Sequence, residues 1–315
     1  MLIHDVSEWL KARDEYIVLV HRRPDGDALG CAAALVEGLR AIGKTAYMLD
    51  AGDVGMYMPY VKPYWAPEGY VPKTVISVDM ATDTLMQRGG DVYIGRIELS
   101  IDHHPSNTGY AGQTYVDPTK AACGEIIYEL LLDMKGSISQ PEALQLFYAI
   151  TTDTGCFSYS NTTAECMHVA ANLIELGAPA TKLNKEFHRT KSRERAALEA
   201  VLTANKEFYR DGKIGVIMRT KEAMNKVGVT ERDADDIAKI PGTIEGVEVG
   251  ITLSEIEEKN TKISVRTTEL VDSNAVCAQL GGGGHKAAAG CYVEEDIYTA
   301  KKMILAAVEN VWPAE

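Results

Sequence analysis

The chain has 315 residues, of which 46% are hydrophobic, and this length suits two domains that each bury a core. Its net charge of -13 argues against long duplex nucleic acid as a partner, because proteins hold such polymers through many lysine and arginine contacts. A short oligonucleotide or a small anion, held by a few local contacts, remains compatible with this charge.

The cysteines and the N-terminal stretch indicate a cytoplasmic protein. None of the six cysteines forms a C-x-x-C pair, which is typical of reduced, buried thiols rather than of a zinc or disulfide framework. Residues 1–16 are amphipathic and charged, unlike a signal peptide, and no apolar run is long enough to span a membrane.

Strands alternate with helices in the first part of the chain. Short apolar runs rich in β-formers predict strands at residues 16–21, 45–49, 73–79 and 97–102. Helical patterns cover residues 28–43, 123–134, 141–153 and 163–178. This alternation predicts an α/β domain with a parallel sheet.

The pattern changes after about Gly177, where a long, polar, helix-prone stretch begins. Beyond it we expect strands at residues 213–218, 246–255 and 262–268 and helices at residues 231–240 and 296–311. The expected organisation is a parallel-sheet domain over residues 1–185, a helical connector over residues 186–206 and a smaller α+β domain over residues 207–315.

Ionisable residues follow the predicted strands of the first domain. The first strand leads into "HRRPDGDALG", the third ends at Asp79, and the fourth runs into "DHH"; the helix that ends in "AITTD" adds Asp153. Strand ends of a parallel sheet meet at one edge, where binding sites form. Each residue alone also has a plain reading as a turn, cap or helix-end residue. Together, so many carboxylates repel one another unless cations neutralise them, and this favours a two-metal centre.

Four motifs in this order, "HRRPDGDALG", "VDMA", "IDHH" and "TDTGCFSYSNTT", resemble those of the DHH phosphoesterase family. "GGGGHKAAAG" resembles the glycine–histidine motif of the DHHA1 domain that often follows. The resemblance covers nearly the whole chain. Its length and two-domain layout look most like those of the NrnA-type oligoribonucleases and pAp phosphatases.

The resemblance implies a pair of Mn2+ ions, for which Mg2+ or Co2+ can substitute, and a specific set of ligands. These are His21 and Asp25 for the first ion, Asp27, His103 and Asp153 for the second, and Asp79 bridging both. Asp102 is expected to orient a neighbouring ligand, and His104 to face the phosphate and act with Asp79 in catalysis. Mixed nitrogen and oxygen ligands suit Mn2+ and argue against a thiolate zinc site. Cys31 and Cys156 are expected only to pack beside the ligand loops.

The second domain is expected to bind the far end of the substrate, with the active site between the domains. The glycine run, including Gly282, Gly283 and Gly284, should leave backbone N–H groups open to an anion. His285 and Arg266 would add contacts to a phosphate or a base. The plain reading of these residues is a flexible loop and a surface arginine.

The leading functional hypothesis is hydrolysis of short RNA and of 3'-phosphoadenosine 5'-phosphate (pAp). A phosphodiesterase for cyclic or linear dinucleotides is the main alternative, because the ligand motifs describe the phosphate and not the base. A family II pyrophosphatase should lack the glycine–histidine motif, and a RecJ-like exonuclease should need more chain. A catalytically inactive nucleotide-binding regulator is disfavoured because every expected ligand is present. A homodimer is left open.

Overall fold

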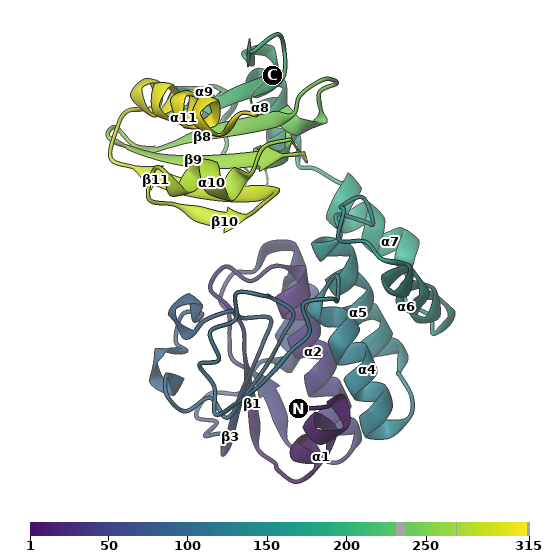
Figure 1. Ribbon diagram of the computed structural model, residues 1–315. Helices are drawn as coiled ribbons and strands as arrows, with labels where there is room; N and C mark the ends of the chain where they lie inside the picture. Colours follow the sequence, from purple (N-terminus) through teal and green to yellow (C-terminus); the bar gives the residue numbers. More distant parts are fainter. Residues whose placement is uncertain (231–236, 269, 314–315) are drawn as a thin grey trace. The chain divides into compact units, whose positions relative to one another are not determined.

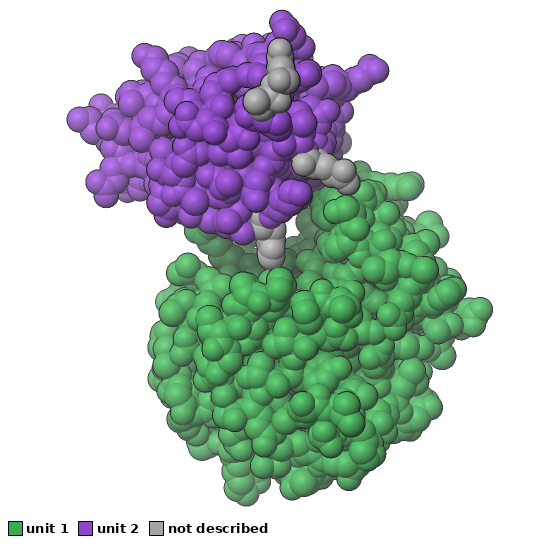
Figure 2. Space-filling model, in the orientation of Figure 1, with its two compact units in different colours: residues 1–190 green, residues 191–315 purple. Residues whose placement is uncertain are grey.

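The computed structural model describes residues 1–230, 237–268 and 270–313, apart from the side chain of His285. The chain divides into two compact units, residues 1–190 and residues 191–315 (Figure 2). Most of the helix expected at residues 231–240 lies outside the described residues, and its described end forms the 3-10 turn Ile237–Lys239. The expected connector contains helix α8 (Arg193–Ala204), which belongs to unit 2.

Unit 1 is built on a five-stranded sheet in the order β2-β1-β3-β4-β5, in which every neighbouring pair is parallel. Its strands are β1 (Tyr16–Leu19), β2 (Ala46–Met48), β3 (Thr74–Val78), β4 (Leu99–Asp102) and β5 (Gln113–Val116). The parallel sheet and its four predicted strands are confirmed. The sequence prediction missed β5, since an edge strand of partly exposed residues lacks the apolar run that marked the others.

The long helices of unit 1 lie on one side of this sheet (Figure 1). They are α1 (Ile3–Lys11), α2 (Gly26–Ala41), α4 (Cys123–Lys135), α5 (Gln140–Asp153) and α6 (Ala164–Glu175), and the short helices are α3 (Met58–Val61) and α7 (Ala180–Asn184). Helices α2 and α5 approach closely, because a Cβ at Gly30 would lie 2.5 Å from the carbonyl oxygen of Gln145. At the neighbouring ends of the two helices, a Cβ at Gly26 would lie 2.5 Å from Thr152 Oγ1, so the start of α2 packs directly on the end of α5.

Unit 2 is an α+β domain, as predicted. Its six-stranded sheet has the order β10-β11-β9-β8-β7-β6, and only the pair β7–β8 is parallel. The strands are β6 (Glu207–Tyr209), β7 (Ile214–Arg219), β8 (Val249–Glu257), β9 (Asn260–Thr267), β10 (Gly283–His285) and β11 (Ala288–Val293). Helices α10 (Ser273–Ala278) and α11 (Ile297–Val311) pack on one face, and α8 and α9 (Lys221–Val227) on the other.

No helix in the described part of the chain combines the length and apolar character that crossing a bilayer requires.

Candidate metal centre

The structure gathers the predicted ligands at the carboxyl edge of the sheet in unit 1. His21 follows β1, Asp79 follows β3, and His103 follows β4. Asp25 caps the N-terminus of α2, and Asp153 ends α5. The close packing of α2 on α5 therefore delivers carboxylates from two helices to the strand ends.

Three overlapping groups of possible ligands form here: His21, Asp25 and Asp79; Asp27, His103 and Asp153; and Asp79, His103 and His104. In the first group, His21 Nε2 lies 3.8 Å from Asp25 Oδ1 and 3.9 Å from Asp79 Oδ2. In the second group, His103 Nε2 lies 3.3 Å from Asp153 Oδ2 and 3.9 Å from Asp27 Oδ2.

His103 Nε2 also lies 3.5 Å from Asp79 Oδ1. The two oxygens of Asp79 thus point to different groups, which is the arrangement that a bridging ligand needs.

Backbone hydrogen bonds orient both imidazoles. His21 Nδ1 donates to the carbonyl oxygen of Arg22 at 2.9 Å, and His103 Nδ1 donates to that of Lys120 at 3.2 Å. Both bonds place the proton on Nδ1 and turn Nε2 toward the carboxylates. Histidines that ligate metals are commonly fixed in this way.

Of the candidate ligands, Asp79 has the surroundings that most clearly favour a bound cation. Its side chain is 2% exposed, and Oδ1 is buried without a hydrogen bond from any residue that the structure describes. Its backbone has φ of +51°, a left-handed conformation that is strained for aspartate and recurs at functional sites. A buried carboxylate oxygen left without a donor fits a metal ion, which would satisfy it.

Asp27 is held by the N-terminus of helix α4. Its carboxylate accepts hydrogen bonds from the backbone N–H groups of Cys123 at 2.7 Å and Gly124 at 2.9 Å. Positive helix N-termini stabilise such anions. The thiol of Cys31 also donates to Asp27, with a sulfur–oxygen distance of 3.2 Å. The expectation that Cys31 only packs is therefore wrong: it also positions an expected ligand.

The carboxylates titrate abnormally because they are buried together. Burial and then the charge of Asp27 raise the pKa of Asp79 well above its usual value, and the same two causes raise the pKa of Asp153 to about 8. Burial also raises the pKa of Asp27. For Asp25, burial is the largest single influence and acts in the same direction, but the hydrogen bond and the charge of His21, together with the backbone N–H of Ala28 and the charge of His104, outweigh it, and the pKa falls. Bound cations would reverse this mutual repulsion, so the electrostatics fit a metal centre.

Asp102 orients His104, and a residue that the sequence prediction missed orients Asp102. Asp102 Oδ1 accepts a hydrogen bond from His104 Nδ1 at 2.7 Å and another from the backbone N–H of His103 at 2.8 Å. Asp102 Oδ2 accepts a hydrogen bond from the Asn107 amide at 2.7 Å. Asn107 lies only five residues after Asp102, but only the fold shows that its side chain turns back to this carboxylate.

The glycine run of unit 2 differs from the expectation. The N–H groups of Gly281 and Gly282 donate to the carbonyls of Ala278 and Cys277, and that of Gly284 donates to the Asn274 side chain. Three of the four amides are thus already bonded, and the prediction of open N–H groups is wrong for them.

Packing explains two of the same glycines. A Cβ at Gly282 would clash with Gly290 and Cys291, and one at Gly284 would lie 2.5 Å from the Ala288 carbonyl oxygen. Arg266 lies on β9 opposite Ala288 and donates to the Val265 carbonyl at 3.0 Å. The expected contact of His285 lies outside the described part of the structure, because its side chain is not described.

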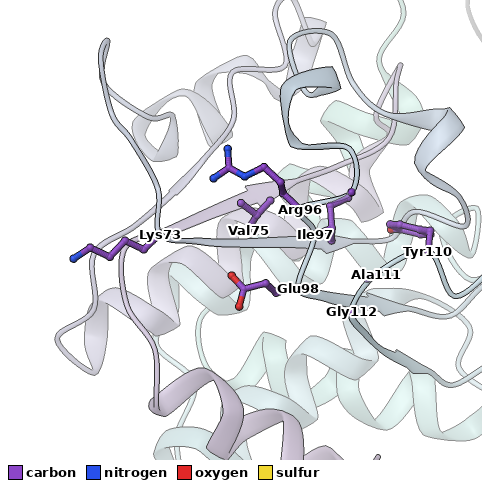
Figure 3. Close-up of a pocket in the computed structure, with 9 residues that line it drawn as sticks. Lys73, Val75, Arg96, Ile97, Glu98, Tyr110, Ala111 and Gly112 are labelled. Atoms are coloured by element: carbon purple, nitrogen blue, oxygen red, sulfur yellow. The ribbon is translucent and has the colours of Figure 1, made fainter.

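A hollow at the opposite edge of the unit 1 sheet is separate from this centre. It lies at the amino ends of β3, β4 and β5 and is lined by Lys73, Arg96, Glu98 and Tyr110 among others (Figure 3). Its charged side chains are of both signs, and no predicted ligand reaches it. We therefore assign the chemistry to the carboxyl edge.

The fold and this cluster define a class: an α/β protein with a candidate centre for two metal ions on a parallel sheet. The family models agree with this class. Residues 15–152 match the N-terminal domain of the DHH family, and residues 211–311 match the DHHA1 domain.

Relatives extend the match to nearly the whole chain. The bifunctional oligoribonuclease and PAP phosphatase NrnA of Thermus thermophilus is 32% identical over 97% of this chain and 93% of its own length. The enzyme of the same name from Bacillus subtilis is 28% identical over 89% of this chain and 90% of its own length. This chain belongs to the DHH phosphoesterase family, as the four motifs predicted.

A solved structure shows the same fold. An exopolyphosphatase-related protein from Bacteroides fragilis superposes with a TM-score of 0.89 at 23% identity, covering 98% of this chain and 95% of that one.

Proposed function

We propose that this protein is a metal-dependent phosphoesterase that hydrolyses short oligoribonucleotides and pAp. The observation that carries the proposal is the buried carboxylate of Asp79. Its two oxygens face His21 and His103 in separate ligand groups, and Oδ1 has no hydrogen bond from the residues that the structure describes. The names of the Thermus thermophilus and Bacillus subtilis relatives support this choice of substrates.

We assign two Mn2+ ions to these groups. His21 and Asp25 would hold the first ion, Asp27, His103 and Asp153 the second, and Asp79 both. Bound there, such ions supply the activation of water and neutralise charge on the phosphoryl oxygens. No protein nucleophile is required for this reaction.

The protein's own part in catalysis centres on His104. Asp102 accepts a hydrogen bond from Nδ1, so the other ring nitrogen, Nε2, is the one directed away from Asp102. We propose that the doubly protonated ring of His104 donates a hydrogen bond from Nε2 to a phosphoryl oxygen and stabilises the charge that develops there, while the Asp102 carboxylate balances the positive charge of the ring. Asn107 and the backbone N–H of His103 hold Asp102 still while this happens.

In unit 2 we assign contacts to the remainder of the substrate to Arg266, His285 and the hairpin residues Gly282, Gly283 and Gly284. Since three glycine amides are bonded to residues of helix α10, we assign the glycines to shaping the hairpin and the side chains to the contacts. A cytoplasmic location suits both the reduced thiols and an RNA substrate. We also propose a homodimer, which analytical ultracentrifugation tests directly.

The test is a substrate panel at equal concentrations: pAp, RNA dimers to pentamers, a cyclic dinucleotide and pyrophosphate, each with Mn2+ and with EDTA. The proposal expects Mn2+-dependent release of mononucleotides from short RNA and of phosphate from pAp. Preference for the cyclic dinucleotide would move the assignment to the main alternative. No hydrolysis of any phosphoester by protein that binds Mn2+ would favour an inactive regulator.

A further inference from the structure

The loop that follows Asp153 is held in a strained conformation. Three consecutive residues have left-handed backbones: Gly155 with φ of +54°, Cys156 with +55° and Phe157 with +65°. Such strain costs free energy at each non-glycine position and persists only where the surroundings enforce it. Strained backbone of this kind clusters at functional sites, so the loop is a candidate functional element.

Hydrogen bonds to the end of α5 enforce this conformation. The N–H of Cys156 donates to the Thr151 carbonyl at 2.6 Å, and the N–H groups of Ser158 and Tyr159 donate to the Thr154 carbonyl at 2.9 and 3.0 Å. Thr154 is fully buried, so the anchor itself is fixed. The loop is therefore a rigid platform rather than a mobile connection.

This loop conformation leaves the aromatic ring of Tyr159 exposed. Tyr159 is 52% exposed, although the same unit buries aromatic residues such as Tyr148 and Phe147 completely or nearly so. One side of the ring lies on Gly155, where any Cβ would overlap the ring atoms. A half-exposed ring backed by a rigid glycine is pre-organised to receive a second flat group.

The loop that carries this ring is tied to an expected ligand of the metal centre. Asn161, two residues further on, donates its side-chain amide to the carbonyls of Asp153 at 3.2 Å and Ala121 at 2.9 Å. Both ends of the loop are thereby anchored at Asp153, whose carboxylate lies 3.3 Å from His103.

We propose that Tyr159 is a stacking platform for a nucleobase of the substrate. This inference rests on the proposed function, since it presumes a nucleotide at the metal centre. Stacking on an aromatic ring accepts every base, because every base has a π-face. The proposal gives unit 1 a base-binding element on the loop that follows Asp153, and it gives the strained conformation of that loop a function.

The rival interpretation is that Tyr159 only covers Gly155. The two readings differ in what happens when the base is removed from the substrate. A covering residue supports the loop whatever the substrate is, whereas a stacking residue acts only when a base is present.

The experiment is a double-mutant cycle between the ring and the base. kcat/KM is measured for the wild type, Tyr159→Ala and Tyr159→Phe on an RNA dinucleotide and on an abasic dinucleotide with the same sugar–phosphate backbone. We expect Tyr159→Ala to lose about tenfold or more on the RNA dinucleotide and nothing on the abasic one. Tyr159→Phe should keep wild-type rates on both, because the π-face remains.

Tyr298→Ala serves as the matched control, since this tyrosine is 59% exposed on α11 in unit 2. Equal losses on both substrates in Tyr159→Ala would overturn the stacking proposal while leaving the proposed function intact. A wild-type protein that hydrolyses neither dinucleotide in the presence of Mn2+ would overturn both. Unchanged Mn2+ binding by Tyr159→Ala, measured calorimetrically, is expected in addition, and its loss would mean that the ring serves the metal loop instead.

Discussion

The ligand loops of unit 1 and the glycine hairpin of unit 2 both carry recognisable motifs, but their residues do different work. In unit 1 the side chains named by the motifs converge, with Asp79 facing both histidine-containing groups. In unit 2 three of the four glycine amides are bonded to residues of helix α10, and two glycines are explained by packing. The comparison teaches that a motif of ionisable side chains predicts the chemistry of its site. A glycine run predicts only that another part of the protein or a ligand approaches the backbone closely.

The largest expected effect concerns Asp79, whose two carboxylate oxygens face the two histidine-containing groups. Asp79→Asn should reduce kcat on pAp by about 1000-fold or more, since it weakens the hold on both ions and roughly 4 kcal/mol of charge stabilisation depends on them. Steady-state kinetics together with metal analysis of the purified variant measure this. Asp91→Asn, an exposed aspartate of the same unit, is the control. Near-full activity in Asp79→Asn would refute the bridging role.

The second prediction asks whether unit 2 acts on the substrate alone. Arg266→Ala should lower kcat/KM for pAp and RNA dinucleotides by about ten- to a hundredfold, the usual cost of a lost charged hydrogen bond. A small dye phosphodiester, which engages only the metal centre, should be hydrolysed at the wild-type rate. Lys262→Ala, on the same face of β9, is the matched control. Equal losses on dye and nucleotide would mean that Arg266 serves the chemistry itself.

The third prediction separates packing from binding within the glycine run. Gly282→Ala should lower the free energy of unfolding by about 1–3 kcal/mol, because its Cβ has no room against Gly290 and Cys291. Gly283→Ala should fold normally, since its Cβ would meet only Asn274 Oδ1 at 3.5 Å. Urea unfolding of both variants is the measurement. If the two variants were equally stable and both lost affinity for pAp, the run would be an anion site after all.

The smallest effect is a pH dependence of stability. Folding without metal raises the pKa of Asp153 from 3.8 to about 8 through burial and then the charge of Asp27, so the folded state holds a proton that the unfolded chain has released. The metal-free protein therefore loses stability as pH rises from about 4 to about 8. Bound Mn2+ displaces that proton, so the gain in Tm on adding Mn2+ should be larger near pH 8 than near pH 5.5. Thermal scans with EDTA and with Mn2+ check this, and a gain that shrinks with pH would contradict it.

Sequence alone predicted the parallel sheet, four of its five strands and the set of residues gathered at its edge. These predictions depended on local physics: buried strands are continuous apolar runs, and the carboxyl ends of parallel strands share one edge. The repulsion among carboxylates at one edge favoured cations, whereas the assignment of individual ligands was implied by the resemblance of the four motifs to the DHH family.

Only the tertiary structure decided which partners hold these residues in place. Asn107 bonds Asp102, the N-terminus of α4 bonds Asp27 across 96 positions of sequence, and the ring of Tyr159 lies on Gly155. It also decided that the glycine run is a hydrogen-bonded hairpin rather than an open anion loop. Local sequence patterns cannot predict such partners, because an amide can bond many different groups and a glycine has no side chain to direct a contact. The packing of the folded chain selects the neighbour in each case.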